Sequence, residues 1–279
     1  MIRSILRDVL PPFIYKWKDK RQSKPVRLFT TFKEASDNCF VQGNHAPYEE
    51  EDIAKMTLFK TKAFIKGLET ANPAYYNKSN TVILLAISAA SSNNCIHVID
   101  LGGAGGIYYF LFKRMFGNRY TLRWHVVETP TMVSHVRELE NEELKYFTSL
   151  ESASDGMEIN ILLSSGVLQY LSEPYLMLEK MIALMPQHML FIRISLAKGD
   201  MDLITIQKSM LNDHGAPGLP EGMENREISL PYINVSENKF LKTLSGKYRP
   251  LAKFEDSDPF FAGKLPVVGY GLLLKREGL

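Results

Sequence analysis

Apolar and polar positions change their pattern abruptly near residue 100 of the chain. Residues 96–99 are mostly apolar, which is typical of a strand covered on both faces. Small residues fill positions 102–106, and glycine lets a backbone turn tightly and a ligand approach closely. Apolar side chains then recur at helical spacing from Tyr108 to Phe116, and Gly117 is a natural stop. The pattern therefore predicts a strand, a glycine-rich turn and a helix, the βα unit that holds cofactors in doubly wound sheets.

Further segments have the apolar content or the alternation of strands. They span residues 120–128, 145–148, 159–165, 188–195, 248–255 and 267–275. The linker 256–266 is too short for a crossover helix, so the last two segments should pair antiparallel. Together with the strand before the glycine turn, these segments predict an α/β fold with a seven-stranded, mostly parallel sheet and one antiparallel strand.

Helical spacing and capping residues predict a set of helices in the first part of the chain. A short helix over 30–39 has Thr31 as its cap and Glu34 three residues on. A longer amphipathic helix covers 49–69 and is broken by Asn72-Pro73. Its buried face is expected to hold Ile53, Met56, Phe59, Ala63 and Phe64. We divide the chain into an N-terminal arm and helical cap, 1–80, and a cofactor-binding domain, 81–279.

Helices are also expected between the strands and near the end of the chain. They cover 81–90, 131–144, a stretch that starts at Ser172-Glu173-Pro174, 202–211, and a last helix that begins at Asn234 with Glu237 and ends at Leu244. Residues 212–235 are rich in glycine and proline and predict a long loop. A loop of this length in a compact domain is typical of a lid or an acceptor loop.

The glycine turn discriminates between cofactors. The dinucleotide fingerprint Gly-x-Gly-x-x-Gly fails in both frames, because Ala104 and Tyr108 stand where glycine is required. The pattern acidic-x-Gly-x-small-x-Gly fits Asp100, Gly102, Ala104 and Gly106, and it resembles the first motif of the Rossmann-like S-adenosylmethionine-dependent methyltransferases. A carboxylate suits the ammonium of that cofactor and would repel a pyrophosphate. The alternative is a glycine-rich turn without a ligand.

Other stretches resemble a family of bacterial methyltransferases associated with surface-polysaccharide gene clusters. The resemblance covers most of the chain and rests on residues 11–12, 100–106, 124–128, 165–171, 193–194, 204–207 and 230–232, of which Leu168-Gln169-Tyr170 is the most specific part. Two departures concern the acceptor: the chain has Ile194-Ser195 where the family has Thr-Pro, and Cys39-Phe40 where it has a glycine–aromatic pair. The resemblance implies a Rossmann-like fold with helices on both faces of the sheet and an N-terminal helical extension.

Candidate cofactor-binding residues follow from the motif and from the strand ends. Glu128 lies about 20 residues after the glycine turn, where an acid accepts hydrogen bonds from ribose hydroxyls; its alternative role is a cap before Thr129-Pro130. The full set is Asp100, Gly102, Gly103, Ala104, Gly106, Glu128, Thr129, Ser149, Leu150, Ser164 and Ser165, with Ser149 and Leu150 expected near the adenine. No metal site is predicted.

Candidate acceptor residues lie after the fourth strand and in the later segments. His214 is the histidine best placed to act as a general base, although a loop histidine is more often solvated. Gln169 and Tyr170 are expected to orient the acceptor, and Arg193, Gln207 and Tyr232 to bind it. Tyr170 is also compatible with packing under the next helix, and Arg193 and Gln207 with buried structural hydrogen bonds.

Composition and charge narrow the class of protein. The net charge of +2 argues against a nucleic-acid binder. The two cysteines, Cys39 and Cys95, form neither a metal motif nor a disulfide framework, so we expect a reducing compartment. Residues 82–90 are too short to span a bilayer, and the charged N-terminus does not resemble a secretory signal, so we expect a cytoplasmic protein. The basic, aromatic arm 1–27 suits either the inner membrane face or packing on the domain or a second subunit, of which we favour packing.

The sequence thus predicts an S-adenosylmethionine-dependent methyltransferase that releases S-adenosylhomocysteine. The expected reaction is O-methylation of a saccharide in bacterial cell-surface glycan biosynthesis, such as that of O-antigen. Natural-product or other small-molecule methylation is the alternative reaction. A catalytically silent cofactor-binding module of a glycan assembly complex is an alternative of another class. An NAD-linked oxidoreductase is disfavoured by Asp100 and Ala104.

Overall fold

The strand and the helix that flank the glycine turn form as the sequence predicts. The computed structural model describes residues 26–39, 50–69, 78–154, 156–213, 218–256, 260–262 and 265–278. Strand β1 (Cys95–Leu101) is buried from its second residue on, and helix α6 (Ile107–Phe116) ends at Gly117. Successive β1 side chains enter two different cores, with Ile96 and Val98 on one face and Ile99 and Leu101 on the other. A strand buried on both faces therefore explains the continuous apolar run.

The central sheet has the predicted seven strands in the order β3-β2-β1-β4-β5-β10-β8. The strands besides β1 are β2 (Thr121–Val127), β3 (Leu144–Phe147), β4 (Ile161–Ser165), β5 (His188–Ala197), β8 (Tyr248–Glu255) and β10 (Leu265–Arg276). Strand β10 pairs antiparallel with both β5 and β8, whereas the other neighbours pair parallel. The predicted α/β fold with one antiparallel strand is confirmed, and β9 (Phe260–Ala262) is an addition that pairs with β10.

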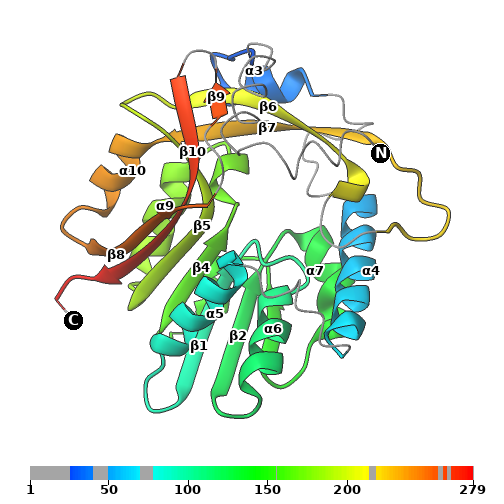
Figure 1. Ribbon diagram of the computed structural model, residues 1–279, viewed down its shortest axis with the longest axis vertical. Coiled ribbons are helices and arrows are strands. Elements are labelled where there is room, and N and C mark those ends of the chain that lie inside the picture. Colours follow the sequence, from blue (N-terminus) through cyan, green and yellow to red (C-terminus); the bar gives the residue numbers. More distant parts are fainter. Residues whose placement is uncertain are drawn as a thin grey trace, which may run out of the picture.

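Helices cover both faces of this sheet, as the fold class requires (Figure 1). On one face lie α4 (Glu51–Leu68), α5 (Lys78–Ala89), α6 and α7 (Pro130–Val136), which share one hydrophobic core with β1 and β2. On the other face lie α8 (Leu150–Ser154), α9 (Pro174–Ala183) and α10 (Glu237–Leu244), which pack into the second core. The short α3 (Phe32–Asp37) begins at the predicted cap, where Thr31 accepts a hydrogen bond from the Glu34 N–H.

Two segments differ from the prediction because they form a β-hairpin. The expected helix over 202–211 is wrong: residues 203–210 form β6 (Leu203–Met210). The expected loop over 212–235 is wrong in its second half, where β7 (Glu227–Ser236) pairs antiparallel with β6. Pro231 lies inside β7, at a point where the strand is paired along one edge only, and a missing N–H is tolerated at such an edge. The end of β7 also pairs with the end of β5.

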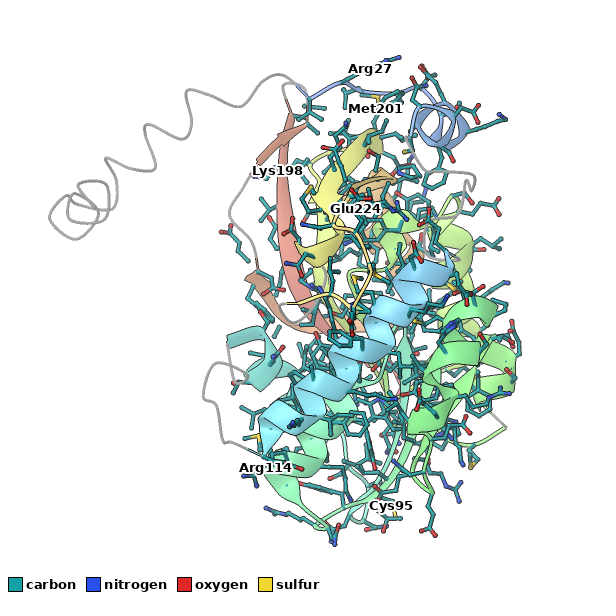
Figure 2. The ribbon with its side chains drawn as sticks, turned by 90° about the vertical axis from the view of Figure 1, so that its right-hand side faces the viewer. Arg27, Cys95, Arg114, Lys198, Met201 and Glu224 are labelled. Carbon is teal, nitrogen blue, oxygen red and sulfur yellow. The ribbon has the colours of Figure 1, made fainter. Side chains whose placement is uncertain are left out.

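This hairpin, which we call the roof, lies beyond the carboxyl ends of the parallel strands (Figure 1). Figure 2 shows Cys95, the first residue of β1, at one end of the molecule and Met201, just before β6, at the other. A buried polar contact joins the roof to β5, since the Ser195 hydroxyl donates to Asn234 Oδ1 at 2.8 Å. Asn234 Nδ2 in turn donates to the Leu203 carbonyl at 2.8 Å and so ties β7 to β6. Strand β5 is thus shared by the central sheet and the roof.

A β-bulge marks the point where β5 passes from the sheet to the roof. Ile194 pairs with Tyr270 and Phe191 with Leu272, so two residues of β5 face one residue of β10. Arg193, one of those two residues, has a left-handed φ of 56°. Left-handed backbone is costly for a residue with a side chain, and bulges commonly re-aim side chains next to functional sites.

Several helix predictions need correction in their details. Helix α7 and the following 3-10 turn η3 (Arg137–Leu139) end before the predicted 144, because Leu144 begins β3. In α4, Phe59 is 41% exposed and Ala63 is exposed, whereas Lys60 and Thr61 are buried. The last helix is capped by Ser236 and not by Asn234, whose side chain is buried in β7. Ser172 forms no cap, although Pro174 does open α9.

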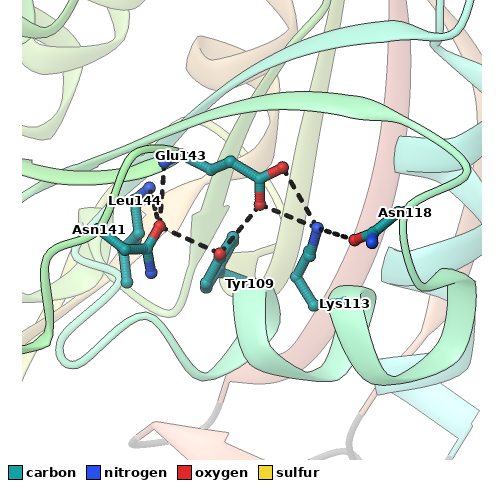
Figure 3. A network of polar contacts seen from close by, with 6 residues as sticks. All are labelled: Tyr109, Lys113, Asn118, Asn141, Glu143 and Leu144. Atoms are coloured by element: carbon teal, nitrogen blue, oxygen red, sulfur yellow. Dashed lines mark hydrogen bonds and ion pairs between the residues drawn. The ribbon is translucent and has the colours of Figure 1, made fainter.

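A polar network fixes α6 behind the glycine turn (Figure 3). The Tyr109 hydroxyl donates to Glu143 Oε2 at 3.0 Å and to Asn141 Oδ1 at 3.2 Å. The Lys113 ammonium lies 3.0 Å from the same Glu143 carboxylate, and only about a quarter of each side chain is exposed. Because Glu143 and Asn141 precede β3, the network ties α6 to the edge of the sheet.

Some predictions concern residues outside the described ranges. They include most of the arm 1–27, the break at Asn72-Pro73 and His214. Among the helices that the structure describes, none combines the length and the apolar content needed to cross a bilayer.

Candidate functional site

A cavity of about 850 Å³ lies between the glycine turn, α4 and the roof. Its walls come from the ends of β1, β2, β4 and β5, from one face of α4 and from the roof strands. The light-blue helix that crosses the front of Figure 2 is α4, which closes one side of the molecule between the sheet and the roof. Eleven of the residues predicted from the sequence line this cavity: Gly102, Gly103, Ala104, Glu128, Thr129, Ser165, Gln169, Tyr170, Arg193, Gln207 and Tyr232.

The glycine turn leaves no room for side chains beneath it. A Cβ on Gly102, whose φ is +68°, would lie 2.3 Å from the Val167 side chain. A Cβ on Gly103 would lie 2.6 Å from Asp100 Oδ2, and one on Gly105 would lie 2.1 Å from Thr61 Oγ1. Glycine is therefore required at these positions by close packing, in addition to any ligand.

Asp100 lies beneath the turn and does not line the cavity. It is fully buried, and its Oδ2 accepts a hydrogen bond from Trp124 Nε1 at 3.2 Å, while Oδ1 has no partner among the described residues. Burial raises the pKa of Asp100 from 3.8 to about 7, against the Trp124 hydrogen bond and together with the Glu128 charge. The sequence led us to expect a direct contact between Asp100 and the ammonium of a ligand, but Asp100 is fully buried against Gly103 and is not among the residues that line the cavity.

Glu128 connects β2 to the glycine turn and faces the cavity. Its Oε1 accepts from the Ala104 N–H at 2.9 Å, and its Oε2 accepts from the Thr129 N–H at 3.1 Å. Burial raises the pKa of Glu128, and the two backbone N–H groups oppose that rise. Each oxygen can accept a second hydrogen bond. The carboxylate is therefore held in a fixed orientation with acceptor capacity left for a ligand.

Four other candidates for cofactor binding lie outside the cavity lining. Gly106 is the left-handed residue before α6, above the side chains of Leu144 and Tyr146. Ser149 caps α8 by accepting from the Ser152 N–H at 3.1 Å, and Leu150 is buried in the second core. Ser164 is a buried strand residue between β1 and β5. None of these four residues is among those that line the cavity.

The opposite end of the cavity is formed by η4 (Leu168–Tyr170) and the roof. The Tyr170 hydroxyl donates to Gln207 Oε1 at 2.6 Å, and its ring packs edge-on against Tyr232 at 5.2 Å between centroids. Burial raises the pKa of Tyr232, although Ser195, Gln169 and Arg193 lie close enough to oppose the rise. The Tyr232 phenol is therefore protonated near neutral pH and can donate a hydrogen bond.

Arg193 points from the bulge of β5 toward the end of β4. Its Nη2 lies 3.2 Å from Ser165 Oγ and 3.4 Å from the Ser165 carbonyl, and its backbone N–H donates to Asp256 Oδ2 at 3.1 Å. Asp256, which also lines the cavity, accepts a further hydrogen bond from Ser79. The alternative of a buried structural Arg193 does not hold, because its side chain is exposed toward the cavity that it lines.

Sequence reasoning missed the contribution of α4. Lys60 and Thr61 line the cavity in the middle of its otherwise apolar buried face, and the Lys60 ammonium donates to the Asn212 carbonyl at 2.8 Å. Burial lowers the pKa of Lys60, and the Asp213 charge opposes this. The detectable signal was a lysine between Met56 and Phe64 at helical spacing, where only apolar residues are expected of a core helix.

The described cavity residues include no histidine, and His214 lies outside the described ranges. The described part of the chain also contains no group of three or more metal-ligating side chains.

Comparison with known proteins gives fold-level likenesses only. Neither a protein-family model nor a curated protein sequence matches the chain. Among solved structures, an S-adenosylmethionine-dependent methyltransferase from Clostridium acetobutylicum has 10% identity over 72% of this chain and 91% of its own, with a TM-score of 0.41. The N-methyltransferase NodS from Bradyrhizobium japonicum, in complex with S-adenosyl-L-homocysteine, has 10% identity over 75% of this chain and 97% of its own, with a TM-score of 0.37. MtNAS in complex with MTA and tNA has 14% identity over 88% of this chain and 81% of its own, with a TM-score of 0.39.

Proposed function

We propose that this chain is an S-adenosylmethionine-dependent methyltransferase. The observation that carries the proposal is Glu128, a carboxylate at the end of β2 that is fixed by two backbone N–H groups and faces the cavity beside the glycine turn. A carboxylate in that place accepts hydrogen bonds from both hydroxyls of a ribose. The failure of the dinucleotide fingerprint favours this cofactor over NAD.

The residues around Glu128 suit a nucleoside. Ile53, Met56 and Met132 provide apolar surface on the same side of the cavity, and Gly102 and Gly103 present bare backbone. S-adenosylmethionine supplies, when bound, an electrophilic methyl group on a sulfonium. The role of the protein is to hold the ribose at Glu128, to exclude water from the cavity under α4 and the roof, and to align an acceptor.

For the acceptor, we propose a saccharide hydroxyl in bacterial cell-surface glycan biosynthesis. The roof end of the cavity supports a polyhydroxylated ligand because it offers phenol, amide and hydroxyl groups, namely those of Tyr170, Gln207, Ser195, Ser209 and Tyr232. Alignment by such groups supplies most of the catalysis of an in-line displacement. A general base at His214 remains part of the proposal. Methylation of another small molecule is the alternative that the same groups allow.

Cofactor binding is the direct test. Isothermal titration calorimetry should detect S-adenosylhomocysteine binding, and Glu128→Ala should weaken it at least about tenfold, because hydrogen bonds to a charged group contribute roughly 1.5–3 kcal/mol each. Glu179→Ala is the matched control, since Glu179 is exposed on α9, and it should bind like the parent protein. Binding of NAD without any binding of S-adenosylhomocysteine would refute the proposal.

Turnover separates the enzyme from a silent cofactor-binding module. Release of S-adenosylhomocysteine should depend on an added acceptor, tested with mixtures of nucleotide sugars and of lipid-free oligosaccharides. Cofactor binding without acceptor-dependent release across both mixtures would favour the silent module over the enzyme.

A further inference from the structure

The Arg193 guanidinium faces the cavity, and no described carboxylate forms an ion pair with it. Among the residues that the structure describes, its side chain contacts the Ser165 carbonyl and Oγ, and no carboxylate lies within 4.0 Å of it. The nearby Asp256 carboxylate accepts from the Arg193 backbone and from Ser79 instead. A guanidinium presents a planar fork of donors that matches a carboxylate. Its placement therefore suits a ligand that carries an anionic group.

Gln169 provides the complementary group directly beside Arg193. Gln169 is only 4% exposed, its Nε2 donates to the Arg193 carbonyl at 3.0 Å, and its Oε1 has no hydrogen-bond partner among the described residues. The opposite orientation of the amide would place Oε1 against the Arg193 carbonyl oxygen, and two acceptors would then face each other. Oε1 therefore points elsewhere and can accept a hydrogen bond there. A buried acceptor without a donor is costly, and Gln169 lines the cavity. A ligand donor at this point would remove that cost.

The Arg193–Gln169 pair lies next to the glycine turn. The Tyr108 hydroxyl, from the first turn of α6, is 3.1 Å from Ser165 Oγ, which in turn is 3.2 Å from Arg193 Nη2. Gly166, between Ser165 and the η4 turn, is close to both side chains: a Cβ there would lie 3.4 Å from Gln169 Nε2 and 3.7 Å from Arg193 Nε. The pair therefore follows the turn directly along the cavity, on the β4 and β5 side, whereas Glu128 lies on the β2 side.

We propose that Arg193 and Gln169 hold the amino-acid end of the cofactor, with the Arg193 guanidinium on its carboxylate and Gln169 Oε1 accepting from its ammonium. This inference rests on the function proposed above, and it moves the ammonium contact from Asp100 to Gln169. One α-amino acid group satisfies both residues at once, because it carries an anion and a cationic donor two bonds apart. A neutral saccharide would leave the guanidinium without a counter-ion.

The test compares two ligands that differ only in the amino-acid end. S-adenosylhomocysteine has the carboxylate and the ammonium, and 5′-methylthioadenosine has neither. Arg193→Gln should weaken S-adenosylhomocysteine at least about tenfold in calorimetry while changing 5′-methylthioadenosine less than about twofold. Gln169→Leu should show the same selective loss, and Arg193→Lys should restore part of it, because the charge remains and the fork is lost.

Controls make each outcome decisive. Arg249→Gln, at an exposed position of β8, should leave both affinities unchanged. If Arg193→Gln does not fold, the unmodified protein serves: the decarboxylated analogue of S-adenosylhomocysteine, which keeps its amine, should bind at least about tenfold more weakly than S-adenosylhomocysteine. Equal losses for both ligands, or no loss, would overturn the inference and leave the proposed function standing. Binding of neither ligand to the unmodified protein would instead refute the proposed function.

Discussion

Replacing Gly103 by alanine tests the packing of the glycine turn against Asp100. The added Cβ would lie 2.6 Å from Asp100 Cγ, 2.6 Å from Oδ2 and 2.9 Å from Oδ1. The carboxyl group cannot yield easily, because Asp100 is fully buried and is bonded to Trp124. Gly103 has no left-handed φ, so steric overlap is the whole effect. Overpacking of this kind costs about 1–3 kcal/mol.

Thermal unfolding measures this cost. At roughly 2–4 °C per kcal/mol for a chain of this size class, the midpoint should fall by about 2–12 °C. Gly117→Ala is the control: its Cβ would meet nothing within 4 Å, and only its backbone conformation (φ 59°, ψ −132°), which residues with a side chain rarely adopt, should matter, at about 1–3 kcal/mol.

A double-mutant cycle with Asp100→Ala isolates the overlap. In the Asp100→Ala background, Gly103→Ala should cost at least about 1 kcal/mol less than in the parent protein, whereas the cost of Gly117→Ala should not change. If the cost of Gly103→Ala is the same with and without the Asp100 carboxyl, the close packing inferred here is wrong.

Two further predictions concern buried charges. The folded-state pKa of Asp100, about 7, is above its usual 3.8, so its contribution to stability should be full below about pH 4 and should be lost as the pH rises to about 7, by up to about 4 kcal/mol. Denaturant titrations at pH 4 and pH 8 should show that Asp100→Asn removes this part of the pH dependence. An equal change in the free energy of unfolding between the two pH values in both proteins would contradict the prediction. Arg226→Ala should destabilise the fold by about 3 kcal/mol, because Glu50, 9% exposed and 2.6 Å from Arg226, would lose its partner. Lys208→Ala, from an exposed pair with Glu227, should cost under about 1 kcal/mol in the same assay, and comparable losses would argue against a special role for Arg226.

The local sequence pattern was sufficient to predict the central strand and the helix that follows it. The run before the glycine turn and the helical repeat after it appear as β1 and α6 within a residue or two. The signal of β1 is strong because burial on both faces leaves no polar position in its run, and that of α6 is strong because its buried side chains recur at helical spacing. The carboxylate after β2 was also predictable, because its position depends on one strand end and a fixed spacing.

The roof was missed although its sequence contained a signal. Residues 203–210 are rich in β-branched side chains, but the flanking Asp202 and the nearby proline and glycine residues favoured a helix followed by a loop. Pro231 argued against a strand, yet one edge of β7 is unpaired there. Whether such a segment becomes a strand depends on the strands with which it pairs, and the periodicity of one sequence does not identify those partners.

The site was predictable where residues follow strand ends and not where tertiary packing decides. Asp100 occupies the acidic position of the motif, but only the folded structure shows that its carboxyl packs against Gly103. Likewise, Lys60 faces the cavity because α4 crosses it, which no local pattern specifies. The left-handed φ of Arg193 follows from a bulge set by the register with β10.

The roof enters and leaves the fold at one place, between β5 and α10, without interrupting β1, β2 or the glycine turn. Exchange of the hairpin would therefore alter one end of the cavity and leave the strands that carry the glycine turn and Glu128 in place. The same boundary is a natural junction for chimeric proteins, in which a different hairpin is grafted after the bulge. If the proposed function holds, such chimeras would change the acceptor and keep the cofactor, with Arg193 at the boundary between the two ends of the cavity.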